Sequence, residues 1–449
     1  MGNYMLDNFF KFKENETDFK TEVIAGVTTF LAMAYILGVN PSMLAEGGMP
    51  ATGVFFSSAV ASGIACIIMG VFAKFPVGLA PGMGLNALFT YTIILNMGNS
   101  WETALAAVFV SNIIFLLITI SGLREIILNT IPVDLKLGIG AGIGFYLAFL
   151  GLKDAGIIVA DSSTLVSMGH LFVPSTLLAL IGILITLVLY VQKVPAAVFF
   201  GMIITASIGV VMSIFGFGTG DALMPTLPAQ VITTNFDLTL FGGFVRGFDQ
   251  LFSNIPNLLM IVFSLVFVTF FDTTGALISL GRQCGFIDED GQAVGIEKAF
   301  LSDAIGGIVG SICGTSTLTA YIESATGIGM GARTGLAAIV TGMLFLLSIF
   351  FSPIVLSLFT SSVTAAALVL VGILMIVQLE AVRWDNLIVA SSVFMTIIMM
   401  MLSYSISLGI AWGFVTYAVA TIAEGKFKEM SWGIYVLVIV FLIYLFFGL

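Results

Sequence analysis

Charged residues are scarce in this chain. They make up 9% of its 449 residues, whereas hydrophobic residues make up 59% and the mean hydropathy is +1.15. A soluble protein of this length needs a charged surface, so a lipid bilayer is expected as the main solvent. The fifteen Lys and Arg residues are too dispersed for a nucleic-acid partner. No long hydrophilic stretch is left for a second domain, which favours one polytopic membrane domain over 1–449.

Cysteine and histidine are also rare. Cys66, Cys284 and Cys313 are too far apart in sequence to form a metal-ligand pair, and we interpret them as small packing residues. His170 is the only histidine and lies in a polar loop, which argues against proton relay by imidazole. Because no Ser-His pair, metal cluster or redox cysteine pair is present, an enzyme is the weakest interpretation, and no cofactor is expected.

Apolar runs recur along almost the whole chain. Windows of about twenty apolar residues, the length needed to cross a bilayer, predict a series of transmembrane spans. They number fourteen, near 21–40, 52–73, 78–97, 101–121, 136–151, 175–191, 195–215, 255–280, 296–312, 315–332, 334–352, 362–378, 386–403 and 405–422. The last apolar run, 432–449, is either a further span or a helix lying in the membrane interface.

The basic residues support this count. With the N-terminus in the cytoplasm, the inner segments hold thirteen of the fifteen Lys and Arg residues, and the outer loops hold only Lys153 and Arg246. An excess of Lys and Arg on the cytoplasmic side is the rule for membrane proteins. One span more or fewer in the middle would move every later loop to the other side. We therefore expect a multi-pass plasma-membrane protein.

Two of the spans are poor continuous helices. The stretch Phe75 to Asn86 contains two prolines and three glycines, and Gly314 to Thr319 is a run of small and hydroxyl residues. Both predict extended backbone that leads into a half-helix, and the two extended stretches are able to pair. Irregular backbone at membrane depth needs protein or a wet cavity to satisfy its polar groups. The third and tenth spans are seven apart, which is the pattern of an inverted repeat with half-helices facing a central ligand.

Two acids lie inside apolar stretches. Asp272 and Glu323 are each surrounded by hydroxyl residues and glycines. An ionisable side chain at membrane depth costs about 2.5 to 3.5 kcal/mol even on the lenient insertion scale, so it is seldom kept without a function. These two carboxylates are the candidate site.

Several motifs resemble one family over nearly the full chain. They are Thr21 to Ile36, Asn40-Pro41, Gly78 to Asn86, Phe271 to Gly275 and Gly314 to Gly327. Together they resemble the AzgA-like purine permeases, a branch of the nucleobase/cation symporter (nucleobase-ascorbate transporter) family that also contains uracil and xanthine permeases. The pyrimidine and xanthine members have other residues where this chain has Thr273-Thr274-Gly275, which argues against a pyrimidine substrate.

The resemblance implies an all-α, uracil-permease-like fold of fourteen spans in two inverted repeats of seven, with short β-strands in spans 3 and 10. It implies a core domain over 21–121 and 255–352 and a gate domain over 136–215 and 362–422. It also implies proton-coupled uptake of a purine base with alternating access. The family precedent further suggests a homodimer formed through the gate domains.

The resemblance also implies roles for individual residues. Asp272 and Glu323 would hold the N–H edge of the base, and Tyr321 and Ile322 would offer backbone N–H groups. The remaining implied positions are Met83, Gly84, Asn86 and Thr273 for the substrate, and Asp303, with Asp272 and Glu323, for the proton.

The hydrogen-bonding groups of a purine match a site made of carboxylates and free backbone N–H groups. A purine base is flat and neutral, and donors and acceptors alternate around it; a carboxylate accepts its N–H groups and a free backbone N–H donates to it. Because the ligand is neutral, a proton on Glu323 or Asp272 is the simplest way to balance the charge of the site. Which purine is preferred stays open at this point.

Each residue also has a structural alternative. Asp272 is able to cap a broken helix, and Glu323 is able to satisfy loose backbone donors. Asp303 is able to pair with Arg333, and Asn86 is able to tie irregular backbone. The glycine run 138–144 looks like a nucleotide loop but lacks a preceding strand and a Lys-Ser/Thr pair, so close helix packing is favoured.

Two other transport functions compete with proton symport. A sodium-coupled nucleobase symporter is the nearer one, because unwound carbonyls and carboxylates also bind sodium. An anion transporter or channel of the same fold is the other. It is disfavoured because both half-helix regions contain acids where an anion site favours basic residues.

Overall fold

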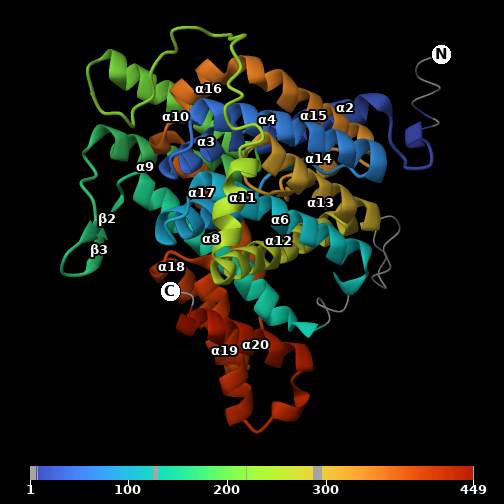
Figure 1. The fold of residues 1–449 in the computed structure, drawn as a ribbon. Coiled ribbons are helices and arrows are strands. Elements are labelled where there is room, and N and C mark those ends of the chain that lie inside the picture. The colour runs from blue at the N-terminus through green and yellow to red at the C-terminus, as the bar shows by residue number, and fades with distance from the viewer. Residues whose placement is uncertain (1–6, 8, 125–129, 219, 287–295, 448–449) are drawn as a thin grey trace.

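The fold is mostly helical, and the computed structural model describes residues 7, 9–124, 130–218, 220–286 and 296–447 (Figure 1). The first part of the chain forms α2 (Phe19–Met33), α3 (Ile36–Glu46), α4 (Ala51–Ile68) with the π-helical η1 (Met69–Ala73), β1 (Leu79–Pro81), α5 (Met83–Ala87) with the π-helical η2 (Leu88–Asn96), α6 (Trp101–Ile120), α8 (Val133–Asp154), β2 (Ile158–Asp161), β3 (Leu165–Met168), α9 (Pro174–Val191) and α10 (Ala197–Ile214).

The second part of the chain also consists mostly of helices, with the short strand β4 among them. It forms α11 (Phe244–Ser253), α12 (Ile255–Gln283), α13 (Ile296–Cys313), β4 (Leu318–Ala320), α14 (Ser324–Gly329), α15 (Gly335–Ser348), η3 (Ile349–Phe351), α16 (Ser352–Leu358), α17 (Ser361–Ile376), the 3-10 turn η4 (Val377–Ala381), α18 (Leu387–Leu402), α19 (Ile406–Ala423), η5 (Phe427–Glu429) and α20 (Trp432–Phe447).

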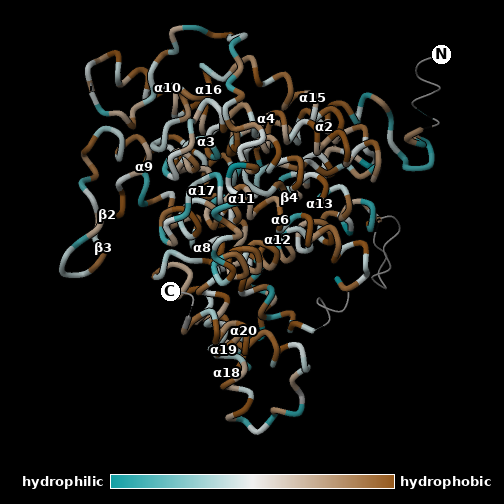
Figure 2. Tube along the Cα trace, viewed as in Figure 1, coloured by the Kyte–Doolittle hydropathy of each residue, from teal (hydrophilic) through white to brown (hydrophobic). Residues whose placement is uncertain are grey.

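The helices have the length and composition of membrane spans. Among the described residues, ten helical segments are long and apolar enough to cross a bilayer, and three shorter apolar helices accompany them over Met83–Asn96, Leu387–Leu402 and Trp432–Phe446. Figure 2 shows that hydrophobic residues cover the helices and that hydrophilic residues gather in loops and at helix ends. The protein is therefore a multi-pass membrane protein, while the count of fourteen spans and the inverted repeat stay predictions.

The two irregular stretches pair as short antiparallel strands. Leu79 lies opposite Ala320, and Pro81 lies opposite Leu318, so β1 and β4 form a two-stranded ladder. The Gly82 N–H donates to the Thr317 carbonyl at 3.0 Å and extends the contact. The prediction of strands in these spans, and of their pairing, is confirmed. Prolines and glycines prevent a continuous helix here, and each stretch satisfies the backbone of the other.

Buried polar side chains support this ladder from behind. The Asn40 amide donates to Ser58 Oγ at 2.6 Å and to Thr315 Oγ1 at 2.9 Å. Gly314 adopts φ +94°, and a Cβ there would lie 2.4 Å from the Leu240 carbonyl oxygen, so only glycine fits. The bend into β4 thus depends on a glycine and on hydroxyl and amide partners.

The helices pack in two groups. The first bundle contains α2, α3, α4, α6, α12, α13, α14 and α15, and the second bundle contains α8, α9, α10, α17, α18 and α19. Helices α5 and η2 lie between them, because α5 contacts α3 and α12 on one side and α8 on the other. Both the β1–β4 ladder and the start of α14 belong to the first bundle, so the irregular backbone is concentrated there.

The glycine run 138–144 lies in α8 and serves helix packing. A Cβ at Gly144 would lie 2.8 Å from the Gly372 carbonyl oxygen of α17, and one at Gly138 would lie 2.9 Å from a Val393 methyl of α18. The close approach of these helices requires small residues at the contact. The packing interpretation of this run is confirmed.

Two features of the fold are absent from the sequence-based prediction. Strands β2 and β3 form an antiparallel hairpin between α8 and α9, with Asp161 Oδ1 accepting hydrogen bonds from the Ser163 and Thr164 N–H groups at its turn. The carboxylate of Glu22, near the start of α2, accepts hydrogen bonds from the N–H groups of Arg333 and Thr334 at 2.7 and 3.0 Å. Glu22 thereby satisfies donors at the N-terminus of α15.

The C-terminal apolar run forms helix α20, which packs against α19 (Figure 1). Phe441 contacts the rings of Phe263, Phe267 and Phe414 at centroid distances of 5.2 to 5.5 Å. The outer face of α20 remains apolar and exposed, with Trp432 at 73% and Phe446 at 78%.

Candidate functional site

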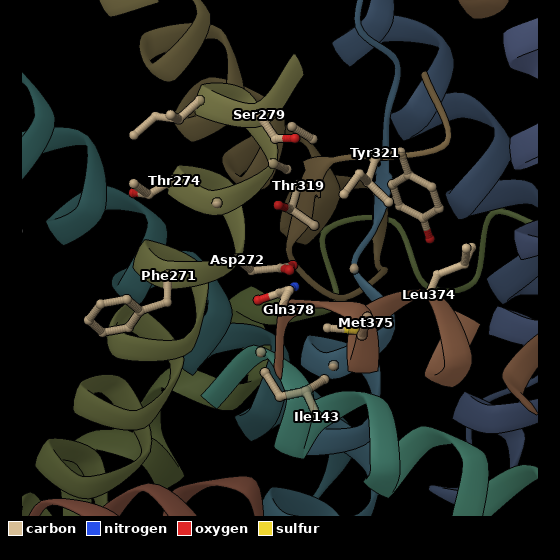
Figure 3. A pocket seen from close by; sticks show the side chains of 18 of the residues that line it. Ile143, Phe271, Asp272, Thr274, Ser279, Thr319, Tyr321, Leu374, Met375 and Gln378 are labelled. Atoms are coloured by element: carbon tan, nitrogen blue, oxygen red, sulfur yellow. The ribbon is translucent and has the colours of Figure 1, made fainter. Parts of the chain in front are cut away.

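A cavity of about 800 Å³ lies between the two bundles (Figure 3). The first bundle and α5 contribute Asp272, Glu323, Tyr35, Thr319, Tyr321, Ile322 and the turn Gly82 to Gly84 to its lining. The second bundle contributes Ile139, Gly140, Ile143, Val371, Leu374, Met375 and Gln378 among others. The cavity therefore joins the two predicted half-helix regions to helices from the other bundle.

Asp272 and Glu323 lie on the same cavity, as predicted. Asp272 projects from the continuous helix α12, and Thr319 of β4 hydrogen-bonds its carboxyl group. Glu323 precedes α14, and its Oε1 accepts a hydrogen bond from the Tyr35 hydroxyl at 2.6 Å. Both side chains are half-buried, so each carboxyl group is partly shielded and still faces the cavity.

The structural alternative for Asp272 is wrong. Helix α12 runs unbroken through Asp272 from residue 255 to residue 283, so there is no broken helix for that side chain to cap. Glu323 makes no side-chain capping hydrogen bond to α14, but its carboxyl group accepts one from its own backbone N–H, as its alternative supposed. The hydroxyl groups of Thr319 and Tyr35 also hold the two acids.

The backbone N–H groups of Tyr321 and Ile322 differ in whether they are already hydrogen-bonded. The Tyr321 N–H donates to the Gly78 carbonyl at 3.0 Å, so the prediction that it is a free donor is wrong. The pairing of β1 with β4 takes up that group. Among the described residues, the Ile322 N–H has no hydrogen-bond acceptor, and Ile322 as a whole is 43% exposed. Ile322 is therefore the one of the pair that presents a free backbone donor.

Met83 and Gly84 begin α5 and line the cavity, as predicted. Asn86, on the same short helix, is fully buried and is not part of the lining. Its Oδ1 accepts a hydrogen bond from Ser316, one residue before the extended β4 region begins its pairing. The structural alternative for Asn86 thus describes its position here: the amide ties two irregular segments together.

Thr273 and Asp303 lie behind the cavity wall. The Thr273 hydroxyl donates to Asp303 Oδ2 at 2.7 Å and lies 3.1 Å from the Thr319 hydroxyl. Asp303 is 1% exposed, and Thr273 is fully buried. The alternative that Asp303 pairs with Arg333 is wrong, because the Arg333 guanidinium donates to the carbonyls of Ile328 and Ala332.

Two carboxyl groups and two hydroxyl groups thus form a row from the protein interior to the cavity. It runs from Asp303 through Thr273 and Thr319 to Asp272, and we call it the hydroxyl row. Sequence spacing did not reveal this row because its members come from α13, α12 and β4. The β1–β4 ladder places Thr319 between the two acids.

The second bundle forms the opposite wall, and this wall is mostly apolar. Ile143 of α8 and Leu374 and Met375 of α17 face the cavity in Figure 3. Gln378 of η4 also lines it, with its carboxamide pointing toward the space next to Asp272. Sequence reasoning missed Gln378, because a single amide at the end of an apolar span looks like an ordinary helix terminus.

The two ends of the interface between the bundles differ. At one end, Arg282, Gln283, Lys136 and Val133 line the cavity, and Val133 is 65% exposed. At the other end, Glu46 and Tyr91 meet Lys153 and Asp154 in a group that we call the far cluster. The Tyr91 hydroxyl donates to Glu46 Oε1 at 3.0 Å and Lys153 Nζ lies 3.0 Å from Asp154 Oδ1.

This fold and this cavity define a class of membrane protein. A polytopic helical membrane protein with paired short strands at the centre and a partly polar cavity between two bundles has the architecture of a transporter with half-helix binding regions. A likeness to a solved structure supports the fold. The transmembrane domain of a cyanobacterium bicarbonate transporter, BicA, superimposes with a TM-score of 0.64 at 17% identity, covering 88% of this chain and 96% of that one.

Sequence comparison then places the chain within that class. It belongs to the permease family, whose model (Xan_ur_permease) matches residues 20–412. The guanine/hypoxanthine permease PbuG of Bacillus subtilis (strain 168) is 43% identical over 452 residues, covering 98% of this chain and 100% of the relative. The adenine permease AdeP of Escherichia coli (strain K12) is 38% identical, covering 98% of this chain and 96% of the relative. These relatives confirm the resemblance to the purine permeases and indicate a transporter, not an enzyme.

Proposed function

We propose that this protein imports purine nucleobases across the plasma membrane by proton symport. The observation on which the proposal rests most is the position of Asp272 and Glu323 on one wall of a single cavity, next to the free N–H of Ile322. The relatives named as guanine/hypoxanthine and adenine permeases support the substrate class.

The wall has the groups that a purine edge requires. Two carboxyl groups accept N–H donors of the base, and the Ile322 N–H donates to a ring nitrogen or an exocyclic oxygen. Tyr35 holds Glu323 through its 2.6 Å hydrogen bond, so the direction of this acceptor is fixed before the ligand arrives. The apolar residues Ile143 and Met375 on the opposite wall suit the flat face of the ring.

The coupling proton has a defined set of positions in the hydroxyl row. A hydroxyl group has one hydrogen to donate. When Thr273 donates to Asp303, the Thr319 hydroxyl must donate to Thr273, and the hydrogen between Thr319 and Asp272 then comes from Asp272. Reversal of every bond moves the proton to Asp303. The two acids at the ends of the row therefore share one proton, and Asp303 joins Asp272 and Glu323 as a coupling residue.

The arrangement of the bundles supports alternating access as part of this proposal. We assign the first bundle to a core domain and the second to a gate domain, in the fourteen-span topology with a cytoplasmic N-terminus. The cavity reaches the end of the interface at Arg282 and Lys136, and the far cluster joins the bundles at the opposite end. In that topology the molecule is open toward the cytoplasm, and the far cluster closes the outer side. A homodimer through the gate domains belongs to the same proposal.

Uptake of radiolabelled bases into cells that express the protein tests this function. We expect accumulation of labelled hypoxanthine, guanine or adenine that is driven by an inward proton gradient and abolished by a protonophore. Competition of each unlabelled base against the labelled one ranks the purines. Uptake that follows a sodium gradient instead would replace proton coupling with sodium coupling, and uptake of anions without purines would overturn the proposal.

A further inference from the structure

Gln378 places a carboxamide on the wall that faces the two acids. The residues that the second bundle contributes to the cavity are apolar or glycine, apart from Lys136 and Gln378. Lys136 lines the cavity together with Arg282 and Gln283 at the open end. Gln378 lies deeper, and in Figure 3 its amide points toward the same space as the carboxylate of Asp272.

A glycine of α8 holds this amide in place. A Cβ at Gly140 would lie 2.4 Å from Gln378 Oε1 and 3.0 Å from its Cδ, so the carboxamide rests directly on the α8 backbone. The change from α17 to the 3-10 turn η4 begins at Val377, one residue earlier. Val377 is 61% exposed, so this turn directs the next side chain inward to the cavity.

The carboxamide has hydrogen-bonding capacity to spare. Among the described residues, neither Oε1 nor Nε2 of Gln378 has a hydrogen-bond partner, although the side chain is half-buried. A carboxamide offers two N–H donors and an acceptor oxygen. The amide lines the cavity and is not enclosed by protein, so a ligand in the cavity is able to form hydrogen bonds with it.

We propose that Gln378 reads the exocyclic group of the purine and thereby sets which bases are accepted. Asp272 and Glu323 hold the N–H edge from the core side, and Gln378 contacts the substituent at ring position 6 from the gate side. That substituent is an oxygen in hypoxanthine and guanine, which accepts, and an amino group in adenine, which donates. Because an amide turns either its nitrogen or its oxygen toward the ligand, Gln378 accommodates both kinds of base. The inference rests on the proposed function.

Substitution of Gln378 tests this reading through selectivity. Gln378→Glu replaces an amide, which donates and accepts hydrogen bonds, with a carboxylate, which only accepts them. The variant therefore favours the amino group of adenine and repels the oxygen of hypoxanthine. We expect the ratio of inhibition constants for unlabelled hypoxanthine and adenine to shift by about tenfold toward adenine, the effect of one hydrogen bond. Gln378→Leu removes both interactions, and we expect weaker binding of both bases by a similar factor with little change in the ratio.

Two further variants separate this role from a general effect on the wall. Gly140→Ala pushes the amide away without changing its chemistry, and we expect it to weaken the binding of both bases, as Gln378→Leu does. Val377→Ile alters the neighbouring exposed residue, and we expect the ratio to stay within about twofold of the wild type. Cell-surface labelling of each variant confirms that equal amounts of protein are compared.

The outcomes distinguish this inference from the proposed function. If the wild type transports purines and Gln378→Glu transports them with an unchanged ratio, the inference is overturned and the function stands. If Gln378→Glu does not reach the membrane, unchanged inhibition constants for both bases in Gln378→Leu overturn it equally. If the wild type transports no purine, the function fails and the inference fails with it.

Discussion

The two walls of the cavity differ in chemistry, although both are built from apolar helices. The wall from the first bundle contains two acids, a hydroxyl row and a free backbone donor. The wall from the second bundle is made of methyl groups and glycines, with Gln378 as its deep polar group. The acids and the hydroxyl row thus lie on one wall, and the opposite wall is mostly apolar. The following predictions test this contrast.

The largest effect is expected at the acids of the first wall. Asp272→Asn and Glu323→Gln keep the shape of the side chains but remove the negative charge and the proton site. We expect each to abolish accumulation of labelled base across a pH jump. Asp249→Asn and Glu297→Gln, at exposed positions, are matched controls that should accumulate normally. Undiminished uptake by either cavity variant would exclude that residue from the role.

A second effect is expected in the hydroxyl row. Thr273→Val and Thr319→Val keep the volume of the side chain and remove the hydroxyl group, whereas the serine variants restore it. We expect the valine variants to lose uphill accumulation and to retain exchange of external for internal base, because exchange needs no net proton movement. Counterflow and gradient-driven uptake, measured side by side, check this. Loss of both activities in valine variants, with no rescue by serine, would assign the hydroxyl groups a purely structural role.

Substitutions in the wall from the second bundle are expected to lower the stability of the protein before they change transport. Gly144→Ala places a Cβ 2.7 Å from Met375 Cβ and 2.8 Å from the Gly372 carbonyl oxygen, so α8 and α17 must separate. Overpacking of this kind costs about 1 to 3 kcal/mol. Thermal unfolding in detergent should therefore begin at a lower temperature. Gly329→Ala, where a Cβ meets no atom within 4 Å, is the control; an equal change in both variants would contradict the packing argument.

The smallest effect is expected at the far cluster. Lys153 is 39% exposed, and partly exposed ion pairs contribute about 0 to 1 kcal/mol. In the proposed topology, Lys153→Gln loosens the outer closure and favours the outward-open form. We expect the half-saturation concentration for external base to fall by at most about fivefold. A rise in the half-saturation concentration, or no change from the wild type even when Lys153→Gln and Glu46→Gln are combined, would show that the far cluster does not stabilise the closed outer side.

Local pattern predicted much of the fold. Apolar length located the helices, and the prolines and glycines of 75–86 and the hydroxyl run 314–319 located the paired strands. These features are set by neighbouring residues and by the bilayer. The hairpin of β2 and β3 and the capping of α15 by Glu22 were missed, because each depends on contacts that composition does not record.

The candidate site was predicted in part for the same reason. A buried charge stands out in an apolar sequence, so Asp272 and Glu323 were found and the structure brings them to one cavity. Whether a polar residue faces the cavity or the interior depends on helix rotation and tertiary packing. Asn86 and Thr273 therefore lie behind the wall, and Gln378, with no distinctive neighbours, was not found.

The ladder between β1 and β4 has a consequence for how a bound molecule moves. Main-chain bonds fasten the start of α5 to the start of α14, although the two segments are more than two hundred residues apart in the chain. Neither segment is able to shift alone without breaking those bonds. The start of α5 and the start of α14, with Glu323 and the Ile322 N–H, therefore form one rigid unit, and in the proposed function a bound base would meet the same geometry on both sides of the membrane.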